Sequence, residues 1–519
     1  MSKKVIARAT LLVTGLSVAS KLLGFGRDQL IAMYFGASAV TDAYLVGMTL
    51  PGLVAGALGG PLGTPLIPVL TALWTQGTRE AREKAWRVTS SILNLVLLSS
   101  VVITVIGIIF APWAVRLLAP GFSGQTLELA ILSARILFPS LLFLSLGAIG
   151  KVILNSAREF TLPALAPIAQ NLLLIAALVF FARFGLLALL VGMLLATTWQ
   201  VVALLPWFFQ SGFRYHWQVD IKSPEIRRVG RLALPLLLGA LVGQIYLVVD
   251  RGLASRLSEG SIAALSFADK IRQVPLGIFV AALSTVLFPV LSEMAARRDW
   301  PQFKDTIAMG LRLVAMITVP SAVGLIVLRV PIVRLLFQRG AFDAADTAST
   351  AAALLYYSLG MMAMAGGTVT SAAFFSLQDT RTPVILGILA GGSNVLLDFL
   401  LVSPMGHRGL ALANALATWG GLLASYLFLS LRLGGLPSLK LLGGLARILL
   451  SSLAMAGATL LTGKLVGGLS VGLPLRQQAQ GLFLAMATGG ALYLFLIAWL
   501  KLEEVSVFLG AIRRRLRGS

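Results

Sequence analysis

Apolar runs of about 20 residues recur from one end of the chain to the other, and each is long enough to cross a bilayer as a helix. Only helices and closed barrels satisfy their backbone polar groups inside lipid, and the short alternating segments of a barrel do not dominate here. Of the 519 residues, 58% are hydrophobic and only 12% are charged, whereas a soluble domain carries about 25% charged residues. The sequence therefore predicts an all-α polytopic membrane protein.

Fourteen transmembrane helices account for these runs, and we place them approximately at residues 9–35, 39–73, 88–112, 126–152, 161–182, 185–209, 230–255, 262–294, 306–330, 347–375, 383–403, 409–431, 443–466 and 479–500. Lys and Arg concentrate in alternate loops, such as "TQGTREAREKAWR" and the terminal "RRRLRGS", which is the positive-inside pattern. This pattern predicts that the N- and C-termini are cytoplasmic. It also explains the net charge of +22, so we expect no nucleic-acid partner.

The chain resembles itself at an offset of about 220 residues. "PLIPVLTALWTQG" resembles "VLFPVLSEMAARR", and "APWAVRLLAPGF" resembles "RVPIVRLLFQRGAF". Individual residues recur with these motifs: Pro68, Arg116, Gly121 and Pro163 pair with Pro289, Arg334, Gly340 and Pro383. Six spans separate equivalent elements, so the two halves keep the same orientation, as in transporters built from parallel repeats. We predict a six-helix lobe at 1–212, a second at 213–437, and two additional helices with a basic cytoplasmic tail at 438–519.

Charged residues inside the predicted spans form two groups that the repeat relates. The first group comprises Lys21, Arg27, Asp28 and Asp42, and the second comprises Asp250, Arg251, Asp269, Lys270 and Arg272. A charge at the bilayer centre costs roughly 2.5–3.5 kcal/mol, so such residues need a functional or structural reason. Neighbours on a helix point about 100° apart. We therefore expect the adjacent pairs, Arg27–Asp28 and Asp250–Arg251, to make ion pairs across helices rather than with each other.

Two interpretations of these charges remain. In one, they are ion pairs that hold helices together. In the other, the repeat brings four spans around one hydrated central cavity, and the basic groups bind phosphate, for which Arg and Lys are the usual partners. The predicted substrate-binding residues are Lys21, Arg27, Asp28, Asp42, Arg251, Asp269, Lys270 and Arg272. Gly- and Pro-rich stretches in the first two spans suit bent helices and close helix contacts.

A separate polar pair lies in the span at 383–403. Asn394 and Asp398 are four residues apart and share one helical face. An intramembrane Asp without a nearby base is a candidate cation ligand or proton carrier. With Asp250, Asn414 and Thr418, this pair forms a candidate Na⁺ or H⁺ site. The alternative is a buried, hydrogen-bonded pair that joins helices. We expect no other cofactor.

Several long motifs resemble those of the MurJ (MviN) family, among them "SKLLGFGRDQLIAMYFGASAVTDAYLV", "ILNSAREFTLPALAP", "FADKIRQVPLGIF" and "RLLFQRGAFDAADT". Family members are lipid II flippases of the multidrug/oligosaccharidyl-lipid/polysaccharide exporter superfamily. The resemblance implies alternating access that moves an undecaprenyl-diphosphate-linked peptidoglycan precursor to the outer leaflet. It also implies a groove for the lipid tail along the last two helices. The residues it assigns to a cationic cavity are Lys21, Arg27, Asp28, Asp42, Asp269 and Lys270.

This chain departs from the family pattern at three places. Members commonly have "LPNLLRR" where this chain has "LPGLVAGALGG", so Ala55 and Gly56 stand where a basic pair would be. Lys21 and Lys270 replace the usual Arg, which keeps the charge but loses the bidentate fork. A cavity without the basic pair would hold a diphosphate less firmly, or would hold it through Arg251 and Arg272. The departures leave the exact cargo open.

We therefore expect a monomeric lipid II flippase of the bacterial inner membrane, driven by membrane potential or an ion gradient, with lipid II and membrane lipids as partners. The alternatives are a flippase for another polyprenyl-diphosphate-linked oligosaccharide and a cation-coupled multidrug antiporter. A membrane enzyme acting on prenyl phosphates would need acid clusters for Mg²⁺ or a placed His. The chain has two His and no Cys, and it lacks G-x-x-x-x-G-K-[ST]. We expect neither an enzyme nor direct use of ATP.

Overall fold

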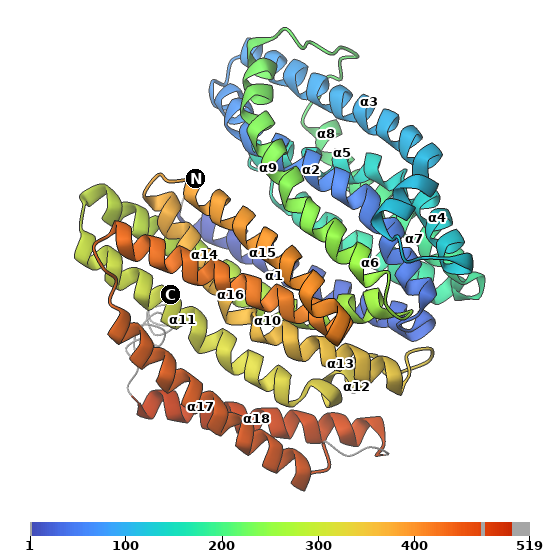
Figure 1. Cartoon of the computed structure of the whole chain (residues 1–519). Helices are drawn as coiled ribbons and strands as arrows, with labels where there is room; N and C mark the ends of the chain where they lie inside the picture. Colours follow the sequence, from blue (N-terminus) through green and yellow to red (C-terminus); the bar gives the residue numbers. More distant parts are fainter. Residues whose placement is uncertain (1–2, 469–472, 501–519) are drawn as a thin grey trace. The chain divides into compact units, whose positions relative to one another are not determined.

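The computed structural model describes residues 3–468 and 473–500, and this part of the chain is built from helices without a strand (Figure 1). The first helices are α1 (Lys3–Phe35), α2 (Ala39–Thr75), α3 (Arg79–Leu118), α4 (Gly124–Leu137), α5 (Ser140–Ser156), α6 (Thr161–Phe181), the 3₁₀ helix η1 (Ala182–Phe184), α7 (Leu186–Val202) and α8 (Leu205–Gln210). The next are α9 (Pro224–Ala254), α10 (Ser261–Arg297), α11 (Trp300–Val327), α12 (Arg329–Phe337), α13 (Ala344–Leu359), α14 (Met361–Ser376), α15 (Arg381–Met405) and α16 (His407–Arg432). The last are α17 (Ser438–Leu465) and α18 (Leu475–Trp499). The predicted all-α class is confirmed.

Most of the predicted spans coincide with helices that suit a membrane. Among the described residues, 10 helices are long and apolar enough to cross a bilayer, or up to 11 with the bent pair α4–α5. The predicted spans at 9–35, 230–255 and 262–294 coincide with α1, α9 and α10, which carry the charged groups apart from Asp42, on α2. A count of fourteen spans is compatible with these helices and stays a prediction.

The internal repeat is visible in the positions of the repeated residues. Pro68 lies in α2 and Pro289 in α10, and both helices are 37 residues long. Arg116 lies in the last turn of α3, and Arg334 lies in the last turn of α12. Matching residues thus occupy matching places in their helices, although α3 has 40 residues and α12 has 9.

Two predicted spans each consist of two helices, and one of these spans is sharply bent. The span at 126–152 is the pair α4–α5, which bends by 44° where Pro139 ends the first helix. Proline has no N–H for the helical ladder and clashes with the preceding turn. The span at 347–375 comprises two helices, α13 and α14, which meet at Gly360 and together form one candidate span, Ala344–Ser376. Helix α2, by contrast, stays one helix despite its internal Pro51, Pro61, Pro65 and Pro68.

The chain divides into two compact units. Unit 1 holds the chain up to Ala263 together with Arg339–Phe342. Unit 2 holds Ala264–Gln338 and the described chain from Asp343 onward. The hydrophobic core of unit 1 joins α2, α3, α5 and α9, and that of unit 2 joins α10, α11, α14, α16, α17 and α18. The predicted lobes at 1–212, 213–437 and 438–519 follow the sequence repeat rather than contacts, and they stay a prediction.

Helices α17 and α18 pack on α11 within unit 2 (Figure 1). The hydroxyl of Tyr493 on α18 donates to the backbone oxygen of Met316 on α11 over 2.6 Å. The side chain of Arg312 on α11 packs against Gly444 of α17. A Cβ added at Gly444 would lie only 2.5 Å from Cδ of Arg312. These contacts hold α17 and α18 against α11.

Glycines on α2 allow close packing against α4 and α5. A Cβ on Gly47, Gly59 or Gly63 would lie 2.6–2.7 Å from a side-chain atom of Ser133, Ala148 or Val152. Lipid supplies no hydrophobic drive for helix association, so close backbone approach through small residues matters more than in water. The predicted close helix contact of this Gly-rich stretch is confirmed.

We expect Gly59→Ala to destabilise the protein and the neighbouring Gly60→Ala to leave it unchanged or slightly more stable. The new methyl group at 59 would overlap Ala148, whereas nothing lies within 4 Å of a Cβ at Gly60. Overpacking costs about 1–3 kcal/mol, while removing a helix-interior glycine gains roughly 0.5–1 kcal/mol. Thermal unfolding midpoints of the two purified variants provide the measurement. Equal midpoints would refute the role of Gly59.

Candidate substrate-binding site

Arg27 lies on α1 with its guanidinium held from two sides. Its Nε and Nη2 donate to Oδ1 of Asp28 over 3.0 and 2.7 Å, and its Nη1 donates to Oδ1 of Asn171 over 3.1 Å. The expectation that Arg27 forms its ion pair across helices is therefore wrong, because the long side chain turns back to its own neighbour. Asn171, on α6, is fixed in turn, since its Nδ2 donates to the backbone oxygen of Ser20 over 3.1 Å.

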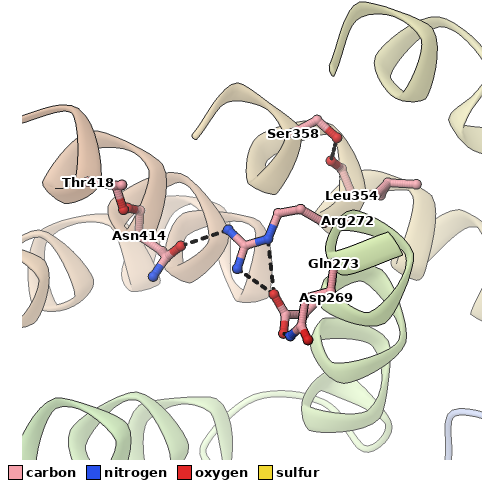
Figure 2. Close-up of polar contacts among 7 residues, drawn as sticks. All are labelled: Asp269, Arg272, Gln273, Leu354, Ser358, Asn414 and Thr418. Atoms are coloured by element: carbon pink, nitrogen blue, oxygen red, sulfur yellow. Dashed lines mark hydrogen bonds and ion pairs between the residues drawn. The ribbon is translucent and has the colours of Figure 1, made fainter. Parts of the chain in front are cut away.

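Arg272 in unit 2 is held in the same way (Figure 2). Its Nε donates to Oδ1 of Asp269 over 3.0 Å, its Nη2 bonds to the same oxygen, and its Nη1 donates to Oδ1 of Asn414 over 3.1 Å. Its guanidinium carbon also lies 4.5 Å from the ring centroid of Tyr357 on α13. Gln273 donates to the second oxygen of Asp269. Each arginine is thus oriented by one Asp on its own helix and one Asn on another.

These bonds use three of the five N–H groups of each guanidinium. One N–H on Nη1 and one on Nη2 remain for a further acceptor. A planar fork with two donors matches the paired oxygens of a phosphate or carboxylate. The arrangement is therefore suited to bind an anion while each arginine keeps its Asp partner.

Asp42 has a structural role that the sequence did not predict. Its Oδ2 accepts from the backbone N–H of Gly260 and its Oδ1 accepts from that of Ala263, both over 2.7 Å. Helix α10 begins at Ser261, so the carboxylate caps that helix, where a negative charge is favourable. Asp42 is only 3% exposed. A role for it in substrate binding stays a prediction.

We expect Asp42→Asn to destabilise the protein by about 1–3 kcal/mol, the usual cost of leaving a buried polar group unsatisfied. An amide keeps the volume but has only one acceptor oxygen, and its NH₂ would face a backbone donor. Glu83→Gln is the control, because Glu83 belongs to a surface pair with Arg79 and such pairs contribute about 0–1 kcal/mol. The measurement is the thermal unfolding midpoint in detergent. A midpoint for Asp42→Asn no lower than that of the control would contradict the capping role.

The remaining predicted binding residues differ in exposure. Lys21 is exposed, and Lys270 is half-buried. Arg251 is also half-buried and lies close enough to Asp42 to attract it electrostatically, and its Nε is buried without a hydrogen-bond partner. Unit 1 holds Lys21, Arg27, Asp28, Asp42, Asp250 and Arg251, and unit 2 holds Asp269, Lys270 and Arg272. One cavity shared by all of them stays a prediction.

The candidate ion-site residues separate into distinct contacts. Asn394 donates through Nδ2 to Oδ2 of Asp398 over 2.6 Å, and both are buried on α15. Asn414 instead bonds to Arg272, and its backbone oxygen accepts from the hydroxyl of Thr418 over 2.6 Å. Within the described chain, no three His, Cys, Asp or Glu side chains gather in a way that could hold a metal ion. The predicted Na⁺ or H⁺ site contains only two acids and remains untested.

Comparison with known proteins assigns the family. The family model described as "Lipid II flippase MurJ" matches residues 31–502. A lipid II flippase MurJ from Burkholderia cenocepacia is 30% identical, over 87% of this chain and 89% of its own length. The chain belongs to the MurJ family. A probable lipid II flippase MurJ from Vibrio cholerae is 29% identical, over 89% of each chain.

Solved structures agree with this MurJ assignment. A lipid II flippase MurJ in an inward closed conformation is 26% identical, with a TM-score of 0.80 over 94% of this chain and 98% of that one. An inward-facing multidrug resistance MATE family transporter of the MOP superfamily is 19% identical, with a TM-score of 0.67, and it shows the fold alone. The predicted family and fold class are confirmed, and the chain is an integral inner-membrane protein.

Sequence reasoning from MurJ motifs missed Asn171 and Tyr357. Both contact a predicted arginine, as described above, but neither is charged. The signal in the sequence is weak: Asn171 is an amide within the apolar run of α6. Its counterpart in unit 2, Asn414, was predicted as an ion ligand, whereas its side chain contacts Arg272.

The structure leaves room at Gly56, one of the two positions of the basic pair missing from the MurJ pattern, whereas Ala55 is buried. A Cβ on Gly56 would have only Nε2 of Gln244 within 4 Å, at 3.8 Å. Gly52 and Gly60, one turn to either side, would meet nothing within 4 Å. This face of α2 therefore lacks both the positive charges and the bulk of a basic pair.

Proposed function

We propose that this chain moves lipid II across the inner membrane without making or breaking a bond in it. The matched family model and the curated relatives carry this activity in their descriptions. The main structural support is that two guanidinium groups, those of Arg27 and Arg272, are each oriented by an Asp and an Asn inside membrane helices. The chain is thus a transporter, and no enzymatic step is assigned to it.

The geometry supports binding of the diphosphate part of lipid II. A guanidinium that is already fixed in the empty site loses less conformational entropy when the ligand binds. Its Asp partner offsets the positive charge while the site is empty, which lowers the cost of holding Arg in an apolar span. The two remaining N–H groups on each arginine then donate to phosphate oxygens. Arg27 and Arg272 are accordingly the residues we assign to headgroup binding, with Lys21, Lys270 and Arg251 adding positive charge.

Transport also needs a driving force, for which we propose membrane potential or a Na⁺ or H⁺ gradient. The buried pair Asn394–Asp398 supports this, because the Oδ1 of Asn394 is buried without a hydrogen-bond partner. Asp250, Asn414 and Thr418 complete the proposed set. The basic inside loops support cytoplasmic termini, and we propose that the monomer is the working form.

The absent basic pair favours a second candidate function, a flippase for another polyprenyl-diphosphate-linked oligosaccharide. We expect Gly56→Arg to fit, because its Cβ position is open. If lipid II is the cargo, a charge-assisted bond of about 1.5–3 kcal/mol should tighten lipid II binding roughly tenfold or more. Gly56→Gln is the uncharged control, and lipid II titration followed by native mass spectrometry is the measurement. No gain over the Gln variant would favour a different cargo.

Rescue of a flippase-depleted bacterium tests the proposal directly. Expression of this chain should restore growth and the appearance of lipid II in the outer leaflet. Membrane expression must be shown in parallel. Good expression without outer-leaflet lipid II would contradict lipid II flipping, and efflux of organic cations by the same cells would point to a multidrug antiporter.

A further inference from the structure

A cavity lies within unit 1, and the charged residues of the candidate site do not line it. It has a volume of about 390 Å³, within the range of small-molecule pockets. Its walls come from α3, α5, α7, α8 and residues 211–222, which we call the strap and which connect α8 to α9. None of the predicted binding or ion-site residues lines it.

The cavity lining is apolar apart from Asn94 and Tyr215. Asn94 is engaged with the strap, since its Nδ2 donates to the backbone oxygens of His216 and Gln218 over 3.0 and 2.9 Å. Its Oδ1 accepts from the hydroxyl of Tyr215. The polar side chains of the described lining are therefore bonded to each other and to the strap. A mostly apolar lining with a few polar groups suits an apolar ligand.

The cavity walls continue into the lipid-facing surface. Leu93 and Leu97 of α3 line the cavity. Val101 and Val105, four and eight residues after Leu97 on the same helix, are exposed. Residues four apart share one helical face. On α8, Phe209 lines the cavity and is 80% exposed. Since α3 and the α7–α8 segment are both candidate membrane spans, the cavity adjoins the hydrocarbon of the bilayer.

The strap has the composition of a membrane–water interface. Tyr215 and Trp217 lie on it, and Trp207 precedes it on α8; such side chains collect at headgroup level. Buried serines of α3 hold it there, since Ser90 and Ser91 accept from the backbone N–H of His216 and Asp220. The strap and the start of α9 carry the basic residues Arg214, Lys222, Arg227 and Arg228. Two acids lie in the same stretch: Asp220 accepts from the backbone N–H of Lys222, and Glu225 is paired with Lys84 over 2.6 Å.

We propose that this cavity binds one acyl chain of an anionic membrane phospholipid whose phosphate lies beside the strap. The apolar walls match a hydrocarbon chain, and the basic residues attract an anionic headgroup. Two of the lining residues pack closely, since a Cβ added at Gly150 would lie 2.9 Å from Leu204 Cδ1. On this ground we favour an unbranched acyl chain over a polyprenyl chain, which carries a methyl branch on every unit.

Photolabelling of the full-length protein in nanodiscs tests this site. The probe is phosphatidylglycerol with a diazirine near the end of one acyl chain, and labelled peptides are mapped by mass spectrometry. We expect labels at residues 93–97 and 201–209, and at least threefold less labelling with a phosphatidylcholine probe. Labels confined to the outer face of α3 at 98–110 would overturn the site. Equal labelling by both probes would overturn the anionic headgroup.

Variants separate the cavity from the general lipid surface. Val201→Trp places a ring in the cavity, and Val102→Trp places the same ring on the lipid-facing side of α3, where Val102 is exposed. Labelling at 201–209 should fall at least fivefold in the first and stay unchanged in the second. Leu97→Trp serves if Val201→Trp does not purify as a single species. Undiminished labelling in a folded cavity variant, or loss of the label on adding undecaprenyl phosphate, would overturn the phospholipid assignment.

Discussion

Arg27→Ala should remove almost all lipid II transport while a folded protein remains in the membrane. Truncating one partner of a buried charge pair costs about 2–5 kcal/mol, which corresponds to a loss of roughly 30-fold to several thousandfold. The loss has two sources: the substrate loses two N–H donors, and Asp28 loses its ion pair with Arg27. The measurement is outer-leaflet lipid II in cells that depend on this chain, together with lipid II binding by the purified protein.

Two further variants separate substrate binding from folding in this experiment. Arg27→Ala combined with Asp28→Ala removes both members of the ion pair, so it should recover stability without recovering transport. Arg79→Ala also removes an arginine–carboxylate pair, but the Arg79 side chain is 86% exposed, and we expect wild-type transport. Full rescue of growth by Arg27→Ala, or recovery of transport in the double variant, would rule out Arg27 as a headgroup ligand.

Arg272→Lys should reduce transport about 10- to 100-fold although the charge is kept. A single ammonium cannot reproduce the fork that bonds Asp269 and Asn414 at once. It would keep the attraction to the ring of Tyr357, so folding should suffer less than transport. A net loss equal to one charge-assisted bond, about 1.5–3 kcal/mol, corresponds to a reduction of this size. Transport is measured as above, and lipid II affinity should fall with it.

Lys270→Arg on the same helix is the matched control for Arg272→Lys. It makes the opposite exchange at the preceding residue, and the MurJ resemblance places Arg there in most members. We expect transport equal to or above wild type. An equal loss of transport in both variants would mean that any change in this turn of α10 disturbs transport. That result would contradict the orienting role of Asp269 and Asn414.

The charged part of the site could be predicted because a charge in an apolar run is conspicuous. Arg27 and Arg272 were both found in this way. Their amide partners were not, since Asn171 carries no charge and its contact with Arg27 spans 144 residues of sequence. The choice between a cross-helix and a same-helix ion pair depends on rotamers of Arg27, which residue spacing does not determine.

Helix positions were predictable from apolar runs, whereas helix breaks were not. Pro139 and Gly360 end helices, yet four prolines within α2 do not. Proline is tolerated inside membrane helices where neighbours satisfy the freed backbone groups. Whether a given proline breaks a span is therefore decided by its tertiary surroundings.

The cap on α10 has a consequence for biogenesis. The two backbone donors that bind Asp42 lie 218 and 221 residues further along the chain. At about 5–20 residues per second, a ribosome needs roughly 10–40 s to make them after Asp42 has been synthesised. During that interval α2 enters the membrane with an acid at its first turn that has not yet met its partners. The insertion machinery must accept this helix before the contact that later buries its carboxylate exists.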